Sequence, residues 1–261
     1  MNRVGQLFRR LRKERRCGFI AYVTCGDPDV ETTVDIVLAL DQAGADAIEL
    51  GIPFSDPIAD GPVIQAAAQR ALQRRTSIRD VFAIARRVRQ TSQIPLIAFS
   101  YVNPILRYSA ERFTADAETA GIDSMLITDL PAEASAEVRN ALRAHRMGGV
   151  FLLAPTSTDA RIAAVNRASD DFIYYVSTTG VTGTRKDLDP ALIARLDEVR
   201  ARVTKPLAVG FGISEHRHYE ELRDHCDAIV VGSAIVRAIG SGDAEGAPER
   251  AAAVVRTILG K

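Results

Sequence analysis

The sequence places two carboxylic acids where acid–base chemistry could begin. Glu49 lies inside the apolar run 48–50, and Asp60 lies in the loop that precedes Pro62. An ionised carboxylate in an apolar segment loses its hydration, so such a group is usually protonated, paired with a cation or used in catalysis. Glu49 is therefore the first candidate for a general acid or base. The structural alternatives are an outward-facing Glu49 in a salt bridge and an Asp60 that caps the following helix.

Glycines stand at the ends of two later apolar runs, where each run gives way to a helical pattern. These segments read Val-Gly-Phe-Gly-Ile-Ser at 209–214 and Val-Gly-Ser-Ala at 231–234. Glycine lets the backbone approach an anion closely, and a helix N-terminus adds N–H donors and a favourable dipole. The pattern predicts a phosphate site at both loops, with simple tight turns as the alternative. A third glycine loop, at 178–187, suits either a lid whose Arg185 and Lys186 attract a phosphorylated substrate or an ordinary flexible loop.

The remaining polar residues give little support for a metal site, a disulfide framework or a catalytic triad. His216 and His218 are two positions apart and would not share a helical face, so we predict no metal site and expect both to face solvent. Cys17, Cys25 and Cys226 have neither the even number of a disulfide framework nor the spacing of a zinc site, which indicates reduced thiols. The sequence contains no Walker loop and no Ser/His/Asp arrangement.

The elements that must position these residues alternate between short apolar runs and amphipathic helical stretches. The runs are nearly continuous in Val, Ile, Leu and Ala, which is typical of parallel strands buried on both faces. They span 19–24, 46–50, 95–100, 124–128, 149–153, 172–177, 206–209 and 228–231. Eight such units in 261 residues, with no linker between them, predict an α/β protein with a single domain, residues 1–261, folded as a (β/α)8 TIM barrel. A doubly wound open sheet would share most of this pattern.

A short motif recurs where helices lead into strands. Ala-Gly-x-Asp occurs at 43–46 and again at 120–123, and a weaker echo, Cys-Asp, occurs at 226–227. Internal duplication and a common type of helix-to-strand connection explain this recurrence equally well.

The N-terminus predicts an extra amphipathic helix before the first strand. The basic run 9–16 overlaps Val4, Leu7, Phe8 and Leu11 at helical spacing, without the aromatic side chains on which nucleic-acid bases would stack. Across the chain 33 basic residues balance 33 acidic ones, so no global field favours nucleic acid or an anionic membrane. No signal-peptide core and no run of ~20 apolar residues is present. We therefore expect a cytoplasmic protein with no nucleic-acid or membrane partner.

In such a barrel the functional residues belong at the C-terminal ends of the strands and in the loops that follow them. The stretch from Ile48 to Gly61 is at such an end, and it resembles the signature of the tryptophan synthase α-subunit family. The resemblance runs along almost the full chain, and its other matching segments are Thr24–Pro28, Asn103–Ile105, Asp129–Pro131, Gly180–Gly183, Gly210–Ile213 and Gly232–Ala234.

The resemblance implies a lyase of tryptophan biosynthesis that splits indole-3-glycerol phosphate into indole and glyceraldehyde 3-phosphate. Glu49 and Asp60 stand at the family's catalytic positions. Glu49 would protonate indole C3 and then, once ionised, take the proton of the side-chain hydroxyl, so its pKa should lie near the working pH. Asp60 would hydrogen-bond to the ring N–H and stabilise the positive charge that develops on the ring.

The resemblance also implies the residues that hold the two ends of the substrate. The family's indole pocket corresponds here to Tyr22, Phe99, Tyr101, Tyr174, Thr182 and Phe211, and its phosphate site to Gly183, Gly212, Gly232 and Ser233. The pair Ala21-Tyr22 stands where Pro-Phe is usual in the family. A buried Tyr22 hydroxyl would need a hydrogen-bond partner, so the pocket departs from the family's usual pattern at this position.

The resemblance finally implies a partner, the tryptophan synthase β subunit, which would carry pyridoxal phosphate in an α2β2 heterotetramer while this chain holds no cofactor. The residues expected at the contact are Pro53, Asp56, Pro57, Asn103, Asp129 and Pro131. One alternative is a free-standing lyase that releases indole without a partner. Another is an activating subunit with slight catalysis of its own, against which the presence of both Glu49 and Asp60 argues.

Overall fold

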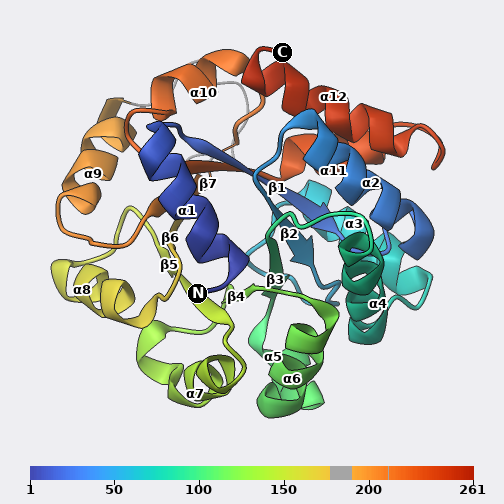
Figure 1. Cartoon of the computed structure of the whole chain (residues 1–261), viewed down its shortest axis with the longest axis horizontal. Coiled ribbons are helices and arrows are strands. Elements are labelled where there is room, and N and C mark those ends of the chain that lie inside the picture. The colour runs from blue at the N-terminus through green and yellow to red at the C-terminus, as the bar shows by residue number, and fades with distance from the viewer. Residues whose placement is uncertain (177–189, 211) are drawn as a thin grey trace.

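The strands of this protein form a closed parallel barrel (Figure 1). The computed structural model describes residues 1–176, 190–210 and 212–261. The strands are β1 (Gly18–Thr24), β2 (Ala47–Gly51), β3 (Leu96–Ser100), β4 (Ser124–Ile127), β5 (Gly148–Leu153), β6 (Ile173–Val176), β7 (Leu207–Gly210) and β8 (Ala228–Val231). Each strand pairs with its sequence neighbours, and β1 also pairs with β8, which closes the barrel. The barrel prediction is confirmed, and the open-sheet alternative is wrong.

Helices surround the barrel and return the chain from the end of each strand to the start of the next (Figure 1). They are α2 (Val30–Ala43), α3 (Pro62–Gln73), α4 (Ile78–Arg89), α5 (Val102–Tyr108), α6 (Ala110–Ala120), the 3-10 turn η1 (Ala132–Ala134), α7 (Ala136–Ala144), α8 (Asp159–Ala168), α9 (Pro190–Arg200), α10 (His216–Leu222), α11 (Ser233–Ile239) and α12 (Ala247–Leu259). None of the helices described is long and apolar enough to cross a membrane.

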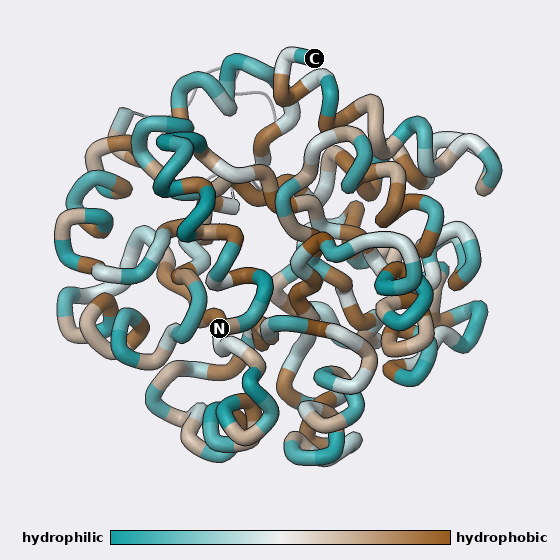
Figure 2. Tube along the Cα trace, in the orientation of Figure 1, coloured by the Kyte–Doolittle hydropathy of each residue, from teal (hydrophilic) through white to brown (hydrophobic). Residues whose placement is uncertain are grey.

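Two layers of core explain why the strands are apolar on both faces. Alternate side chains of β2, such as Ile48 and Leu50, pack outward in the large core that includes the helices. Ala47 points the other way and packs in the inner core of the barrel. Figure 2 shows the hydrophobic residues concentrated on the strands and on the inward sides of the helices.

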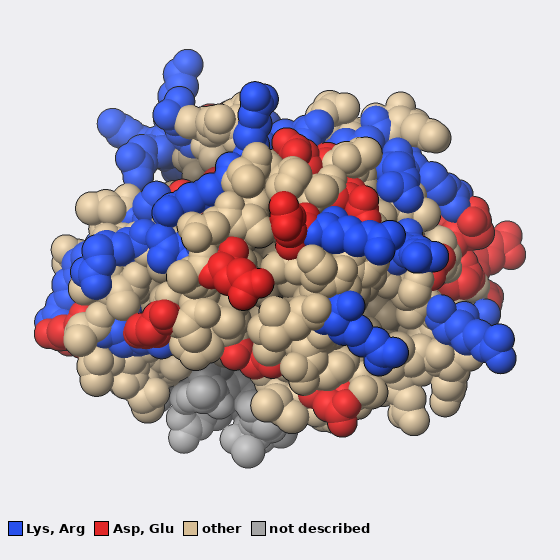
Figure 3. Space-filling model, turned by 90° about the horizontal axis from the view of Figure 1, so that it is seen from below, with Lys and Arg blue, Asp and Glu red and all other residues tan. Residues whose placement is uncertain are grey.

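The predicted extra helix is α1 (Arg3–Glu14), which covers the N-terminal end of the barrel (Figure 1). Its buried residues Val4, Leu7, Phe8 and Leu11 belong to the inner core, and the Phe8 ring lies 5.2 Å from that of Phe172. The basic residues between them are exposed, as expected for an amphipathic helix. In Figure 3 Lys and Arg side chains gather along the upper edge of the molecule.

The Asp of the recurring motif has the same hydrogen bond at each of its three positions, and Asp170, outside the motif, repeats it before β6. The carboxylate before an even-numbered strand accepts the backbone N–H near the start of the preceding odd-numbered strand. The four pairs are Asp46 with Phe19 at 2.9 Å, Asp123 with Leu96 at 3.0 Å, Asp170 with Gly149 at 3.1 Å and Asp227 with Leu207 at 2.8 Å. The echo in the sequence thus marks a shared hydrogen-bonding role at the N-terminal end of the barrel.

The expectation that His216 and His218 face solvent is confirmed for His216, which is exposed, and is wrong for His218. His218 is buried, and its Nδ1 lies 3.4 Å from the backbone nitrogen of Ser214. His216 is partly covered by the end of α12, and its Nδ1 is 2.9 Å from the carbonyl oxygen of Ile258. The His218 side chain is therefore enclosed by the surrounding fold, whereas His216 remains exposed despite its contact with Ile258.

Candidate active site

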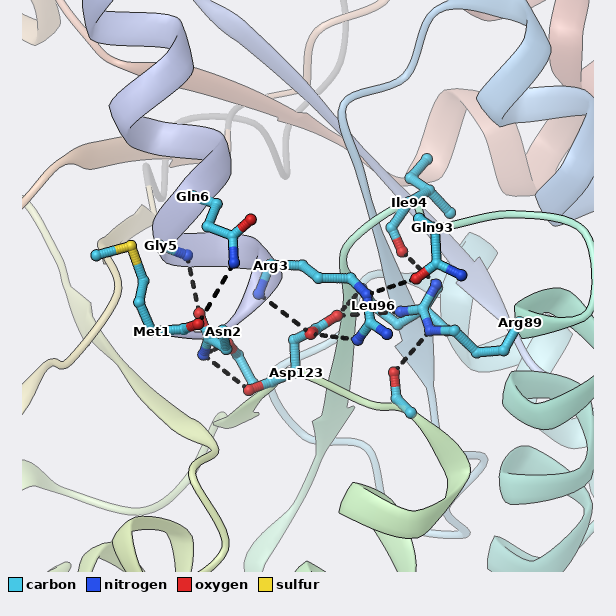
Figure 4. Close-up of polar contacts among 12 residues, drawn as sticks. Met1, Asn2, Arg3, Gly5, Gln6, Arg89, Gln93, Ile94, Leu96 and Asp123 are labelled. Carbon is cyan, nitrogen blue, oxygen red and sulfur yellow. Dashed lines mark hydrogen bonds and ion pairs between the residues drawn. The ribbon is translucent and has the colours of Figure 1, made fainter.

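A cavity of about 380 Å³ opens at the C-terminal ends of the strands. Its lining includes Tyr22, Glu49, Asp60, Phe99, Tyr174 and Gly232. A larger hollow of about 880 Å³ lies at the opposite end, beside α1. Its buried carboxylate, Asp123, already binds Arg3 at 2.9 Å and Arg89 at 3.0 Å (Figure 4). We therefore place the chemistry in the smaller cavity, where the candidate carboxyl groups lie.

Glu49 points into the barrel and is completely buried. Neither of its carboxyl oxygens has a hydrogen-bond partner in the part of the chain that the structure describes. Burial raises the pKa of Glu49 from 4.5 to about 8, because the charged form loses its hydration. The group is therefore mostly protonated at neutral pH and can donate a proton. The alternative of an outward-facing salt bridge is wrong.

Asp60 lies on the loop after β2 and is held by Tyr101. The Tyr101 hydroxyl donates to the Asp60 carboxylate at 3.1 Å and accepts the N–H of Ala59 at 3.0 Å. Burial raises the pKa of Asp60 from 3.8 to about 6, and the hydrogen bond from Tyr101 partly opposes that rise. Helix α3 is capped by Gly61 without a side-chain hydrogen bond, so the helix-cap interpretation of Asp60 is wrong.

The two carboxyl groups differ in the way that acid–base catalysis requires. At pH 7 the pKa values of about 8 and about 6 leave Glu49 mostly protonated and Asp60 mostly ionised. One cavity then contains a proton donor and a fixed negative charge. No cluster of three or more His, Cys, Asp or Glu suited to a metal is found among the described residues.

Aromatic rings form much of the remaining wall. The rings of Tyr22 and Phe99 meet edge to face at 5.1 Å, and Tyr174 lines the same cavity. Gly51 leaves room for Tyr22, since a Cβ there would lie 2.2 Å from the Tyr22 hydroxyl oxygen. Tyr101 does not line the cavity and instead holds Asp60.

Sequence reasoning missed several wall residues. Leu152 and Val230 are apolar strand residues that line the cavity, and Thr128 and Arg161 lie at its edge. The alternation of side chains along β5 and β8 would have suggested the first two. Nothing in the sequence distinguishes Arg161, a helical arginine that pairs with Glu133.

The predicted phosphate residues are only partly described. Gly232 lines the cavity just before α11, and Ser233 is the first residue of that helix. Gly212 lies in an exposed position after β7. The other predicted substrate residues, Thr182, Gly183 and Phe211, lie outside the described residues.

The predicted partner-contact residues follow β2, β3 and β4 at the end of the barrel where the cavity opens. Asp56, Asn103, Asp129 and Pro131 are exposed, and Pro57 is half-buried. Asp129 also accepts the N–H of Val102 at 2.7 Å. Pro53 is buried in the isolated chain, and its contact with a partner stays a prediction.

Comparison with known proteins decides the family. The model of the family "Tryptophan synthase alpha chain" matches residues 8–258. This chain belongs to that family. It is 51% identical over 239 residues to the tryptophan synthase alpha chain of Solibacter usitatus, covering 92% of this chain and 90% of the relative. It is 42% identical to that of Burkholderia lata, covering 99% and 94%.

Solved structures of the same family share the fold. A chain from the tryptophan synthase α2β2 complex of Pyrococcus furiosus superposes with a TM-score of 0.90 at 38% identity, covering 94% of this chain and 98% of that one. The tryptophan synthase α subunit of Legionella pneumophila gives a TM-score of 0.90 at 32% identity, covering all of both chains. The sequence resemblance to this family and its TIM-barrel fold are confirmed.

Proposed function

We propose that this chain cleaves indole-3-glycerol phosphate into indole and glyceraldehyde 3-phosphate, with Glu49 and Asp60 as its catalytic residues. Membership of the tryptophan synthase α family supports the substrate and the lyase reaction. The observation that carries the assignment of roles is the pair of carboxyl groups in one cavity whose pKa values lie on opposite sides of pH 7.

The reaction uses each carboxyl group in its stable protonation state. Protonated Glu49 gives its proton to indole C3, and the positive charge that forms on the ring is stabilised by ionised Asp60 at the ring N–H. The bond from C3 to the glycerol chain then breaks, and its electron pair restores the aromatic indole. Ionised Glu49 takes the hydroxyl proton as that carbon becomes an aldehyde. Glu49 thus ends the cycle protonated again.

The two ends of the cavity suit the two ends of this substrate. Tyr22, Phe99 and Tyr174 provide an apolar wall for the indole ring, with Thr182 and Phe211 as further proposed contacts. Gly232 lines the cavity and has no side chain, so an anion can approach the backbone there. The proposed donors to the phosphate are the backbone N–H groups near Gly183, Gly212, Gly232 and Ser233.

We further propose that the chain functions with a tryptophan synthase β subunit in an α2β2 heterotetramer. The similar chain of the P. furiosus α2β2 complex supports this partner. The exposed residues Asp56, Asn103, Asp129 and Pro131 lie at the end of the barrel that contains the cavity, as transfer of indole to a partner would need. Pyridoxal phosphate would belong to that β subunit, because the steps proposed for this chain are proton transfers between Glu49 and the substrate.

Indole release from indole-3-glycerol phosphate, measured with and without a β subunit, tests this proposal. We expect turnover by the chain alone, an increase on adding the β subunit, and loss of both in Glu49→Gln. High turnover that a β subunit does not change would indicate a free-standing lyase. Absence of turnover from the chain in both assays, with activation of the β subunit, would contradict the catalytic assignment.

A further inference from the structure

Tyr22 brings a hydroxyl group into the same cavity as the two carboxyl groups. Its side chain is buried, with 6% of its surface exposed. The hydroxyl oxygen is 3.4 Å from Thr24 Oγ1, a long contact in which the threonine donates. Within the described part of the chain, no acceptor receives the hydrogen of the Tyr22 hydroxyl. Such a buried donor requires a partner.

The strand register places Tyr22 beside Glu49 on the inner face of the barrel. Tyr22 on β1 is directly opposite Glu49 on β2. Its hydroxyl oxygen extends over Gly51, where a Cβ would lie only 2.2 Å away. Glu49 and Gly51 are two residues apart and so share the inward face of β2, separated by ~7 Å along the strand. A glutamate side chain that turns towards Gly51 covers most of that distance.

Of the two carboxyl groups in the cavity, Glu49 is the one that accepts no hydrogen bond from the described residues. Both of its carboxyl oxygens are unpaired among the described residues, whereas Asp60 already accepts a hydrogen bond from Tyr101. We propose that the Tyr22 hydroxyl donates a hydrogen bond to the Glu49 carboxylate once Glu49 has given its proton to the substrate. Tyr22 is thus a positioning residue that stabilises the ionised form of the acid, an inference that rests on the proposed function.

The charges that act on the Tyr22 hydroxyl include both carboxyl groups of the cavity, Asp60 more strongly than Glu49. Burial holds the pKa of Tyr22 well above its usual value, so the hydroxyl keeps its proton throughout the working range. Among the described residues, the other titratable or charged groups around the cavity include Asp60 after β2, Tyr101 after β3, Arg161 on α8 and Tyr174 on β6. Arg161 is paired with Glu133, and Asp60 carries negative charge, which would oppose ionisation of Glu49.

The pH dependence of kcat/KM in Tyr22→Phe tests the inference. The parent should show a bell-shaped profile, because activity requires ionised Asp60 on the acidic limb and protonated Glu49 on the basic limb. A hydrogen bond to the ionised form lowers the pKa, so its removal should move the basic limb upward by about one pH unit. The rate at the optimum should fall by roughly ten-fold, because proton donation becomes harder by the same amount.

Two matched tyrosine variants serve as controls. Tyr101→Phe removes the donor to Asp60 and should move the acidic limb upward without moving the basic limb. Tyr175→Phe removes a hydroxyl from the large core that includes the helices, and it should move neither limb. A basic limb unchanged in Tyr22→Phe would overturn the inference. An acidic limb that moves instead would assign the hydroxyl to Asp60 and would also overturn it.

A spectroscopic titration makes the test independent of turnover. The infrared band of a protonated carboxylic acid, assigned by its loss in Glu49→Gln, reports the pKa of Glu49 directly. That pKa should be higher in Tyr22→Phe than in the parent, and equal values would refute the inference even if either protein were inactive. An inactive parent with the expected infrared shift would instead refute only the proposed function.

Discussion

Glu49→Gln should make the protein's stability less sensitive to alkaline pH, because the buried carboxyl group opposes folding once the unfolded chain can ionise. Below pH 4.5 Glu49 is protonated in both the folded and the unfolded state, and its ionisation favours neither. Above that pH the unfolded state loses the proton first, while the folded state retains it until about pH 8. Stability of the parent therefore falls with rising pH across this window. Glutamine does not titrate.

The size of the effect follows from the width of the window. Each pH unit between the ordinary pKa of 4.5 and the buried value of about 8 removes about 1.4 kcal/mol from the free energy of unfolding. The accumulated loss is roughly 3 kcal/mol at pH 7 and approaches ~5 kcal/mol above pH 8. Glutamine has a fixed cost for its own unpaired buried amide, so the slope with pH is the informative quantity.

Urea unfolding followed by circular dichroism at pH 5, 7 and 9 measures this slope. The free energy of unfolding of Glu49→Gln minus that of the parent should rise by a few kcal/mol from pH 5 to pH 9. Asp60 titrates in both proteins and largely cancels from the difference. A difference that stays constant across the three pH values would refute the conclusion that burial holds Glu49 protonated.

Two further variants test the other parts of the site. Asp60→Asn should lower turnover by roughly 10²-fold or more while thermal stability is retained, because it removes the charge that stabilises the protonated ring. Normal turnover with reduced stability, measured by indole formation and thermal unfolding, would show that Asp60 has a structural role. Gly232→Val should fold, since a Cβ there meets its nearest neighbours at 3.4 Å, but its larger side chain should weaken glycerol phosphate binding in calorimetry. Glu49→Gln serves as the control, because its phosphate end is unchanged. If Gly232→Val bound glycerol phosphate as tightly as Glu49→Gln does, Gly232 would not belong to the phosphate site.

The strands were predictable because burial on both faces produces continuous apolar runs. The same property hides which way each side chain points. Ala47, Ile48, Glu49 and Leu50 are all buried, so no alternation of polarity in the sequence shows that Glu49 faces the cavity. Only the paired strands of the barrel determine that direction. The sequence therefore predicted the importance of Glu49, and the structure was needed to reject the salt-bridge alternative.

The error at His218 and the burial of Pro53 have a common cause. A polar ring in the first turn of a helix and a proline in a loop are usually exposed, and local sequence suggests nothing else. Both are buried by parts of the fold that local sequence does not reveal, and α10, for example, packs against α12. The Tyr22 hydroxyl is a similar case, because the space that it occupies is provided by Gly51 on the neighbouring strand.

The role of Glu49 is tested most directly by the turnover of indole-3-glycerol phosphate by Glu49→Gln, compared with the parent at pH 7 and with equal amounts of folded protein. We expect a fall of at least ~10²–10⁴-fold, the usual loss on removing a general acid or base, because Glu49 acts in both proton transfers. Glycerol phosphate binding should remain, since the phosphate end of the cavity is unchanged. Near-normal indole formation by Glu49→Gln would contradict the central claim that this buried carboxyl group carries the proton.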